Sequence, residues 1–135
     1  MGGLATYGKQ LAFEGALPND TEFFVGLLTT VPTDDAGTGL VEATGSGYAR
    51  IGHSTWLSIV DSSEWYRVNK DAVELAVLTS DLTGILGWGI WTLGAGGSLV
   101  AWGSLVDVDS NSVTRTYKSG DQPRFISQEI RVGVG

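Results

Sequence analysis

Few side chains in this sequence could carry out nucleophilic or acid–base chemistry. His53 is the single histidine, and Ser54 follows it directly. A catalytic Ser–His pair requires a shared geometry, whereas neighbouring residues of a strand point to opposite faces. The sequence also lacks a Gly-x-Ser-x-Gly nucleophile elbow. We therefore predict a surface or edge-strand histidine and no enzymatic activity.

Paired carboxylates could hold a metal ion. Asp107 and Asp109 open a segment that begins like the calcium loop of an EF-hand. Its sixth position is Ser112 instead of glycine, its twelfth is Lys118 instead of glutamate, and no flanking helices are predicted. The pattern favours an ordinary polar β-turn, so we predict no metal.

The segment 45–50, Gly-Ser-Gly-Tyr-Ala-Arg, begins like the glycine-rich fingerprint of dinucleotide-binding proteins. Arg50 stands where the third glycine belongs, and the flanking sequence predicts neither a preceding parallel strand nor a following helix. We therefore predict no nucleotide cofactor. Two glycines within three residues favour a tight turn with positive φ.

Aromatic side chains could stack on sugars or bases, and the chain has five tryptophans. Three of them fall in a predicted hairpin, where core or intersubunit packing is the simpler explanation: Trp88, Trp91 and Trp102. Trp56, Trp65 and Tyr66 flank the polar stretch 61–64, which indicates a position near a surface. Because Trp and Tyr are enriched at protein contacts, we predict a protein interface at these three residues and keep a glycan-binding surface as the alternative.

The composition limits the class of protein and its partners. The chain has 135 residues, with 8 Lys and Arg against 15 Asp and Glu, a formal net charge of −7. This length predicts a single domain, 1–135. The charge argues against binding nucleic acid or an anionic membrane. Cysteine is absent, and neither a membrane-spanning stretch nor a secretory signal pattern is found, so we expect a cytosolic site of synthesis.

The hydrophobic pattern predicts one helix followed by strands. Leu4, Tyr7 and Leu11 share a helical stripe within 4–17, and Pro18 ends it. From residue 22 to 135 the period is two. The segment 23–30 is apolar on both faces, as in a central strand covered by a sheet on one side and by the helix on the other.

Glycine-rich turns separate the predicted strands. The clearest hairpin joins 86–93 to 98–106 through Gly94-Ala95-Gly96-Gly97. About eight strands at this spacing predict an all-β fold, a compact, jelly-roll-like β-sandwich of residues 22–135 with one short N-terminal helix.

The order of several short motifs is similar to that of small virion proteins of tailed bacteriophages, labelled tail-fibre or head-decoration proteins. The matching segments are 24–30, Pro32-Thr33-Asp34, Gly47-Tyr48-Ala49-Arg50, Trp88-Gly89-Ile90-Trp91, Gly96-Gly97-Ser98-Leu99 and Ser119-Gly120-Asp121. A tryptophan expected before the hairpin is replaced by Leu82 or Thr83, and 56–67 aligns with nothing in the family. The segment 56–67 is therefore the predicted place for a specific contact.

This resemblance implies a structural protein without catalysis, assembled into the virion in the host cytoplasm. The compact, acidic chain favours a capsid decoration or cement protein on the head exterior, a homotrimer bound to the major capsid protein or other virion proteins. The alternatives are a tail, neck or fibre-adaptor protein and a carbohydrate-binding module for host glycans. We expect the helix stripe of Leu4, Tyr7 and Leu11 either to cover the sandwich or to contact a neighbouring subunit.

Overall fold

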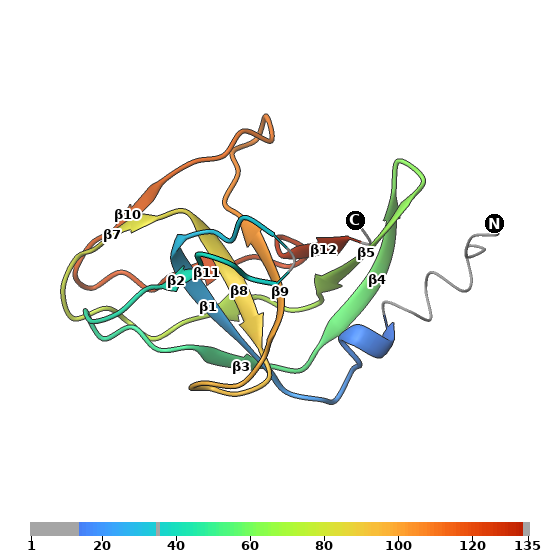
Figure 1. The fold of residues 1–135 in the computed structure, drawn as a ribbon, viewed down its shortest axis with the longest axis horizontal. Coiled ribbons are helices and arrows are strands. Elements are labelled where there is room, and N and C mark those ends of the chain that lie inside the picture. The colour runs from blue at the N-terminus through green and yellow to red at the C-terminus, as the bar shows by residue number, and fades with distance from the viewer. Residues whose placement is uncertain (1–13, 35, 134–135) are drawn as a thin grey trace.

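The protein is described by a computed structural model, which covers residues 14–34 and 36–133 (Figure 1). Strands dominate it, and the described part of the N-terminal helix spans residues 14–16. The predicted fold class, an all-β sandwich with a short N-terminal helix, is confirmed. Most of the predicted 4–17 helix, including Leu4, Tyr7 and Leu11, lies outside the described residues. No helix within the described ranges has the length and apolar character needed to cross a membrane.

The described chain contains strands of two to eight residues. They are β1 (Phe23–Thr30), β2 (Val41–Glu42), β3 (Ile51–His53), β4 (Trp56–Asp61), β5 (Glu64–Asn69), β6 (Val73–Glu74), β7 (Leu82–Ile85), β8 (Gly87–Trp91), β9 (Leu99–Ser104), β10 (Arg115–Tyr117), β11 (Arg124–Phe125) and β12 (Arg131–Gly133). This is a finer division than the eight strands of the sequence pattern. The difference arises mainly because the two-residue strand β2 is too short to show an alternation, and because β5 and β7, of six and four residues, do not alternate between apolar and polar residues.

All strand pairs are antiparallel. The main sheet has the order β2-β1-β8-β9, with β3 also paired to β1. A three-stranded sheet has the order β12-β5-β4, and two small sheets join β7 to β10 and β6 to β11. The predicted hairpin is confirmed as β8 and β9, which pair from Gly87 opposite Ser104 to Ile90 opposite Ala101, with a bulge before Trp91 opposite Leu99.

The core lies between the main sheet and the smaller sheets. Val25 and Leu27 of β1 and Ile90 of β8 are fully buried on the core side of the main sheet. Trp56, at the start of β4, and Phe125 of β11 join the same apolar cluster. β1 is buried on both faces as predicted, but over Gly26 its outer face is covered by Tyr48, Trp91 and Glu42 in place of the expected helix.

Candidate functional site

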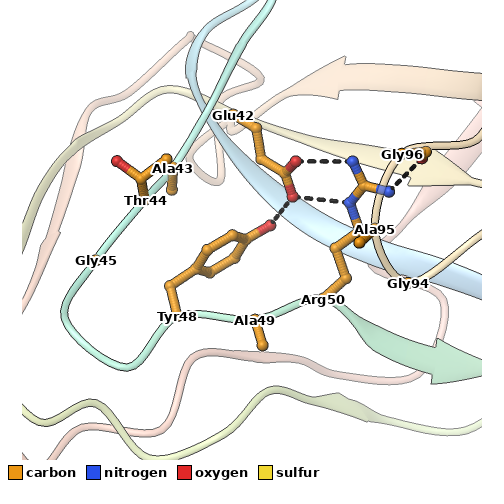
Figure 2. Close-up of a pocket in the computed structure, with 10 residues that line it drawn as sticks. All are labelled: Glu42, Ala43, Thr44, Gly45, Tyr48, Ala49, Arg50, Gly94, Ala95 and Gly96. Atoms are coloured by element: carbon orange, nitrogen blue, oxygen red, sulfur yellow. Dashed lines mark hydrogen bonds and ion pairs between the residues drawn. The ribbon is translucent and has the colours of Figure 1, made fainter.

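A hollow with polar side chains in its lining opens on the outer face of the main sheet (Figure 2). Its volume is about 400 Å³. It lies between the end of β2, the loop that follows β2 and the turn that joins β8 to β9. The lining residues are Glu42, Ala43, Thr44, Gly45, Tyr48, Ala49, Arg50, Gly94, Ala95 and Gly96.

The loop that forms one wall turns sharply at Gly45, Ser46 and Gly47. All three residues have positive φ, at 76°, 59° and 78°. The Tyr48 N–H closes the turn on the Gly45 carbonyl at 2.9 Å. The Ser46 hydroxyl donates to the Asp81 carbonyl at 2.8 Å and so ties the turn to the body. The tight turn expected from this glycine-rich segment is therefore present.

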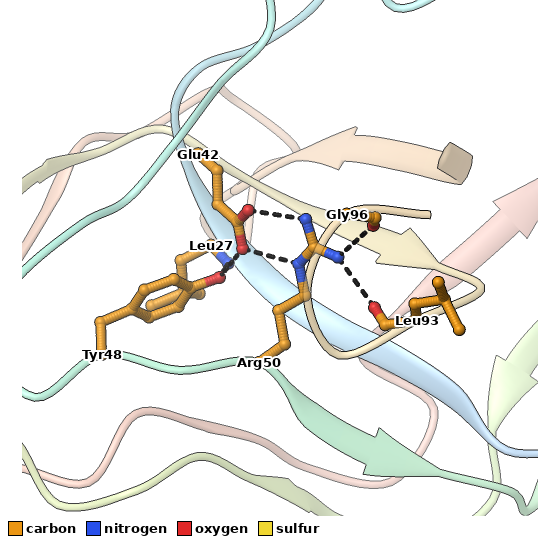
Figure 3. Close-up of polar contacts among 6 residues, drawn as sticks. All are labelled: Leu27, Glu42, Tyr48, Arg50, Leu93 and Gly96. Atoms are coloured by element: carbon orange, nitrogen blue, oxygen red, sulfur yellow. Dashed lines mark hydrogen bonds and ion pairs between the residues drawn. The ribbon is translucent and has the colours of Figure 1, made fainter. Parts of the chain in front are cut away.

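Two side chains return from this loop to the sheet, and we call Glu42, Tyr48 and Arg50 the Arg50 network (Figure 3). Arg50 donates from Nε and Nη2 to the two carboxylate oxygens of Glu42, each at 2.8 Å. Its Nη1 donates to the carbonyls of Leu93 and Gly96, both at 2.8 Å. One guanidinium therefore joins β2 to the β8–β9 turn, a fork geometry that lysine cannot reproduce.

Tyr48 completes the network and supplies a hydrogen-bond acceptor to a backbone N–H on the edge of β1. Its hydroxyl donates to Glu42 Oε2 at 2.5 Å and accepts the backbone N–H of Leu27 at 3.0 Å. Leu27 lies between the stretches of β1 that pair with β3 and with β2, so its N–H would otherwise lack a partner. The phenol thus substitutes for a missing strand at this point.

The Arg50 network packs on the ring of Trp91, which can lie close to the sheet because the residues beneath it are glycines. The guanidinium of Arg50 stacks 3.9 Å from the centre of a Trp91 ring, and Trp91 in turn lies over Gly26 and Gly89. A Cβ on Gly26 would lie 2.9 Å from Trp91 Cζ3 and closer still to the Tyr48 hydroxyl oxygen. Only glycine therefore lets the aromatic and polar side chains lie flat on this face.

The electrostatics of the site keep these groups engaged with one another. Burial, reinforced by the hydrogen bond to Glu42, raises the pKa of Tyr48 well above its usual value. The phenol is therefore neutral and donating at physiological pH, and the Glu42 carboxylate accepts three hydrogen bonds. This arrangement holds the loops in place, and its ionisable side chains are all engaged in hydrogen bonds with one another or with the backbone.

Other sequence candidates occupy structural positions. His53 is on β3, where its Nε2 lies 2.8 Å from the Thr55 carbonyl oxygen. Asp107 Oδ1 accepts the backbone N–H groups of Asp109 and Asn111 at 2.9 and 3.0 Å, so the predicted polar turn is present. Within residues 14–34 and 36–133, no cluster of three or more His, Cys, Asp or Glu side chains could hold a metal ion.

The aromatic residues predicted at an interface do not form one surface. Trp56 is 1% exposed in the core, so its expected surface position is wrong. Its strand begins beside the core, where the ring meets His53 edge-on, 5.0 Å between centres, and the polar stretch 61–64 is the distant turn of the hairpin. Trp65 and Tyr66 are half-buried neighbours on β5, so they point to opposite faces. Leu4, Tyr7 and Leu11 belong to the part of the chain that the structure does not describe.

The Arg50 network was only partly visible in the sequence. The segment ending in Arg50 stood out by its glycines and by family resemblance, but neither signal paired Arg50 with Glu42. Glu42 belongs to a strand of two residues and carries no periodic signal. The carbonyls of Leu93 and Gly96 lie more than forty residues along the chain from Arg50.

The fold and the site together define a structural domain, an all-β body whose polar groups fix its own loops. The comparison with known families agrees with this class. The family model for the podophage GP4 fiber I protein gp80 matches residues 10–133. The chain belongs to this family, and the match supports a non-enzymatic structural component of a bacteriophage virion, as the sequence resemblance implied. The search of curated proteins found no match.

Proposed function

We propose that the protein is a subunit of the fibre or fibre-attachment apparatus of a podophage virion. The observation that carries this proposal is the match to a fibre protein family over residues 10–133, nearly the whole chain. A fibre shaft is usually repetitive, whereas these 135 residues contain no internal repeat. The domain therefore suits a tip, a cap or an adaptor better than a shaft.

The Arg50 network supports a role in which the shape of the domain must persist. Arg50 holds the β8–β9 turn and β2 in one arrangement through four hydrogen bonds. A subunit whose loops are fixed before assembly loses less conformational entropy when it docks. A homotrimer, the state expected from the sequence, would match a three-fold fibre, and sedimentation of the purified chain tests it.

A capsid decoration or cement protein is the second candidate. The net charge of −7 and the small single body favour it, since a protein on the head exterior avoids contact with packaged DNA. Many copies would then contact the major capsid protein, each through a modest interface.

Copy number and position distinguish the two candidates. Quantitative mass spectrometry of purified virions gives the copies per particle relative to the major capsid protein, and antibody–gold labelling of the same particles gives their place. A low count with label at the tail or neck supports the fibre proposal. Hundreds of copies with label over the head would replace it with the decoration role.

A further inference from the structure

The β4–β5 hairpin has an outer edge that the described fold leaves open. β4 is the last strand of the sheet β12-β5-β4, and in Figure 1 the tip of this green hairpin stands clear of the main sheet. Its pairing with β5 is unbroken from Trp56 opposite Asn69 to Asp61 opposite Glu64. This unbroken strand of six residues is therefore paired on one edge only among the described strands.

The register shows which backbone groups point outward. In a hairpin closed by two residues, the flanking pair, here Asp61 and Glu64, shares hydrogen bonds, and alternate residues of β4 then point away from β5. Trp56, Ser58 and Val60 are the outward residues. Trp56 confirms this direction, because its N–H donates to Asn19 Oδ1 at 2.6 Å outside the sheet.

Beyond Trp56, the outward edge has no partner in the part of the chain that is described. The N–H and C=O groups of Ser58 and Val60 make no hydrogen bond with any residue of 14–34 or 36–133. Val60 is 54% exposed and Leu57, on the opposite face of β4, is 37% exposed, so an exposed apolar side chain lies on each face of this edge. Such an edge can accept an added strand.

The other edges of the sheets carry features that discourage pairing. The register of β9 with β8 is interrupted by a bulge next to Trp91, and β2 and β3 have two and three residues. β12 is three residues long and begins with a charged residue, Arg131. β4 has no bulge, no proline and no lysine. β4 therefore lacks the features by which proteins prevent an exposed strand edge from pairing with another strand.

The charge of the chain indicates the chemistry of the occupant. A second copy would bring another net charge of −7, and the arginines of this sheet are already engaged. Arg131 donates to Asp61 at 2.8 Å, and Arg67 is buried with its Nε on the Leu17 carbonyl. Glu64 at the exposed tip has no ion pair among the described residues and instead suits a basic partner.

We propose that the outer edge of β4 binds an extended segment of another virion protein, in which apolar residues alternate with Lys or Arg. The segment adds as a strand, bonding to the backbone of Ser58 and Val60, while its apolar side chains cover Val60 on one face and its basic side chains lie on the opposite face, that of Asp61. This inference rests on the proposed function only in placing the chain within a virion; it holds for an attachment at the tail or at the head.

Amide hydrogen exchange tests the edge directly. Tagged chain is purified alone and, separately, as the complex recovered from phage-infected cells, and exchange is measured with residue-level fragmentation. We expect the amides of Ser58 and Val60 to exchange at least about tenfold more slowly in the complex. Leu57 and Ile59, whose amides bond to β5, are the internal controls and should be slow in both samples.

Three results would overturn the inference: equal exchange of Ser58 and Val60 in both samples, protection that already appears when the purified chain self-associates, and failure of the chain to enter any complex. The second result would identify a second copy as the occupant. The first contradicts only the strand-docking edge, and gold label over the head contradicts only the fibre proposal, so the two failures are distinguishable.

A pair of substitutions at Val60 provides an independent test. Val60→Pro removes an outward N–H without touching the bonds to β5, whereas Val60→Thr keeps this N–H and nearly the same side-chain shape. We expect Val60→Pro to lower the yield of the complex about tenfold, the change for one lost backbone hydrogen bond, and Val60→Thr to preserve it. Wild-type yield for Val60→Pro would refute the proposal. If this variant fails to fold, the exchange experiment on the wild type decides.

Discussion

Replacing Arg50 by methionine removes the guanidinium that joins β2 to the β8–β9 turn. The side chain of Arg50 is 8% exposed and that of Glu42 is 24% exposed, so the pair is largely shielded from water. Met keeps much of the apolar volume over Trp91 but leaves the carboxylate with Tyr48 as its remaining partner in the network. The carbonyls of Leu93 and Gly96 lose their donor as well.

The expected cost follows from this geometry. Breaking a buried ion pair typically costs about 3–5 kcal/mol, and the partial exposure of Glu42 places this case near the lower end, about 3 kcal/mol. For a domain of this size, about 3 kcal/mol corresponds to a fall in Tm of about 12 °C.

Chemical and thermal unfolding, followed by circular dichroism and tryptophan fluorescence, measure this loss. Arg124→Met is the matched control, because Arg124 is exposed, and its free energy of unfolding should stay within about 0.5 kcal/mol of the wild type. Adding Glu42→Gln to Arg50→Met should restore about 1 kcal/mol, since it removes the unpaired carboxylate. A loss below about 1 kcal/mol for Arg50→Met, the range of an exposed ion pair, would refute the structural role assigned to the network.

Three further predictions concern the same body. The free energy of unfolding of the wild type should fall above pH 10, by up to about 1.4 kcal/mol per pH unit. The folded state keeps the Tyr48 proton because its pKa is raised, whereas the unfolded phenol, with its ordinary pKa of 10.0, ionises. Tyr48→Phe should lack this component when unfolding is measured as a function of pH. Gly26→Ala should cost about 1–3 kcal/mol in urea unfolding because its Cβ collides with Trp91 and Tyr48. The control Gly15→Ala, whose Cβ meets nothing within 4 Å, should instead gain up to about 1 kcal/mol because residue 15 is helical, and equal stabilities of the two variants would contradict the close layer. Ser63→Gly should raise the free energy of unfolding by about 0.5 kcal/mol, because Ser63 has a φ of 67° in the hairpin turn, and a lower Tm would count against this account.

Short hydrophobic segments bounded by turn residues were predicted correctly. The strand at 23–30 was predicted from a run that is apolar on both faces, and the β8–β9 hairpin from two apolar segments joined by a glycine-rich turn. Trp56 was misplaced because it stands close in sequence to a polar turn, and distance from the core cannot be seen in so short a segment. Position in a sheet depends on which strands pair, and strand pairing is a long-range property.

The Arg50 network shows the same limit for sites. Its donors and acceptors come from β2, from the loop before β3 and from the β8–β9 turn, segments that only the folded chain brings together. The positive-φ turn at Gly45 to Gly47 was predictable, because glycine is the residue such a turn needs. The partner of Arg50 was not predictable, because several acidic residues stood at comparable distances in the sequence.

The two regions that matter most use their polar groups in opposite ways. In the Arg50 network the donors and acceptors satisfy one another, so substitutions there should act on stability and leave docking unchanged below the Tm. On the outer edge of β4 the backbone groups of Ser58 and Val60 have no partner among the described residues, so their loss costs the isolated chain little. Arg50→Met should therefore lower the free energy of unfolding and still form the complex at low temperature. Val60→Pro should keep the free energy of unfolding near the wild-type value and lower the yield of the complex. A variant pair that lost stability and complex together would show that the two regions act as one unit.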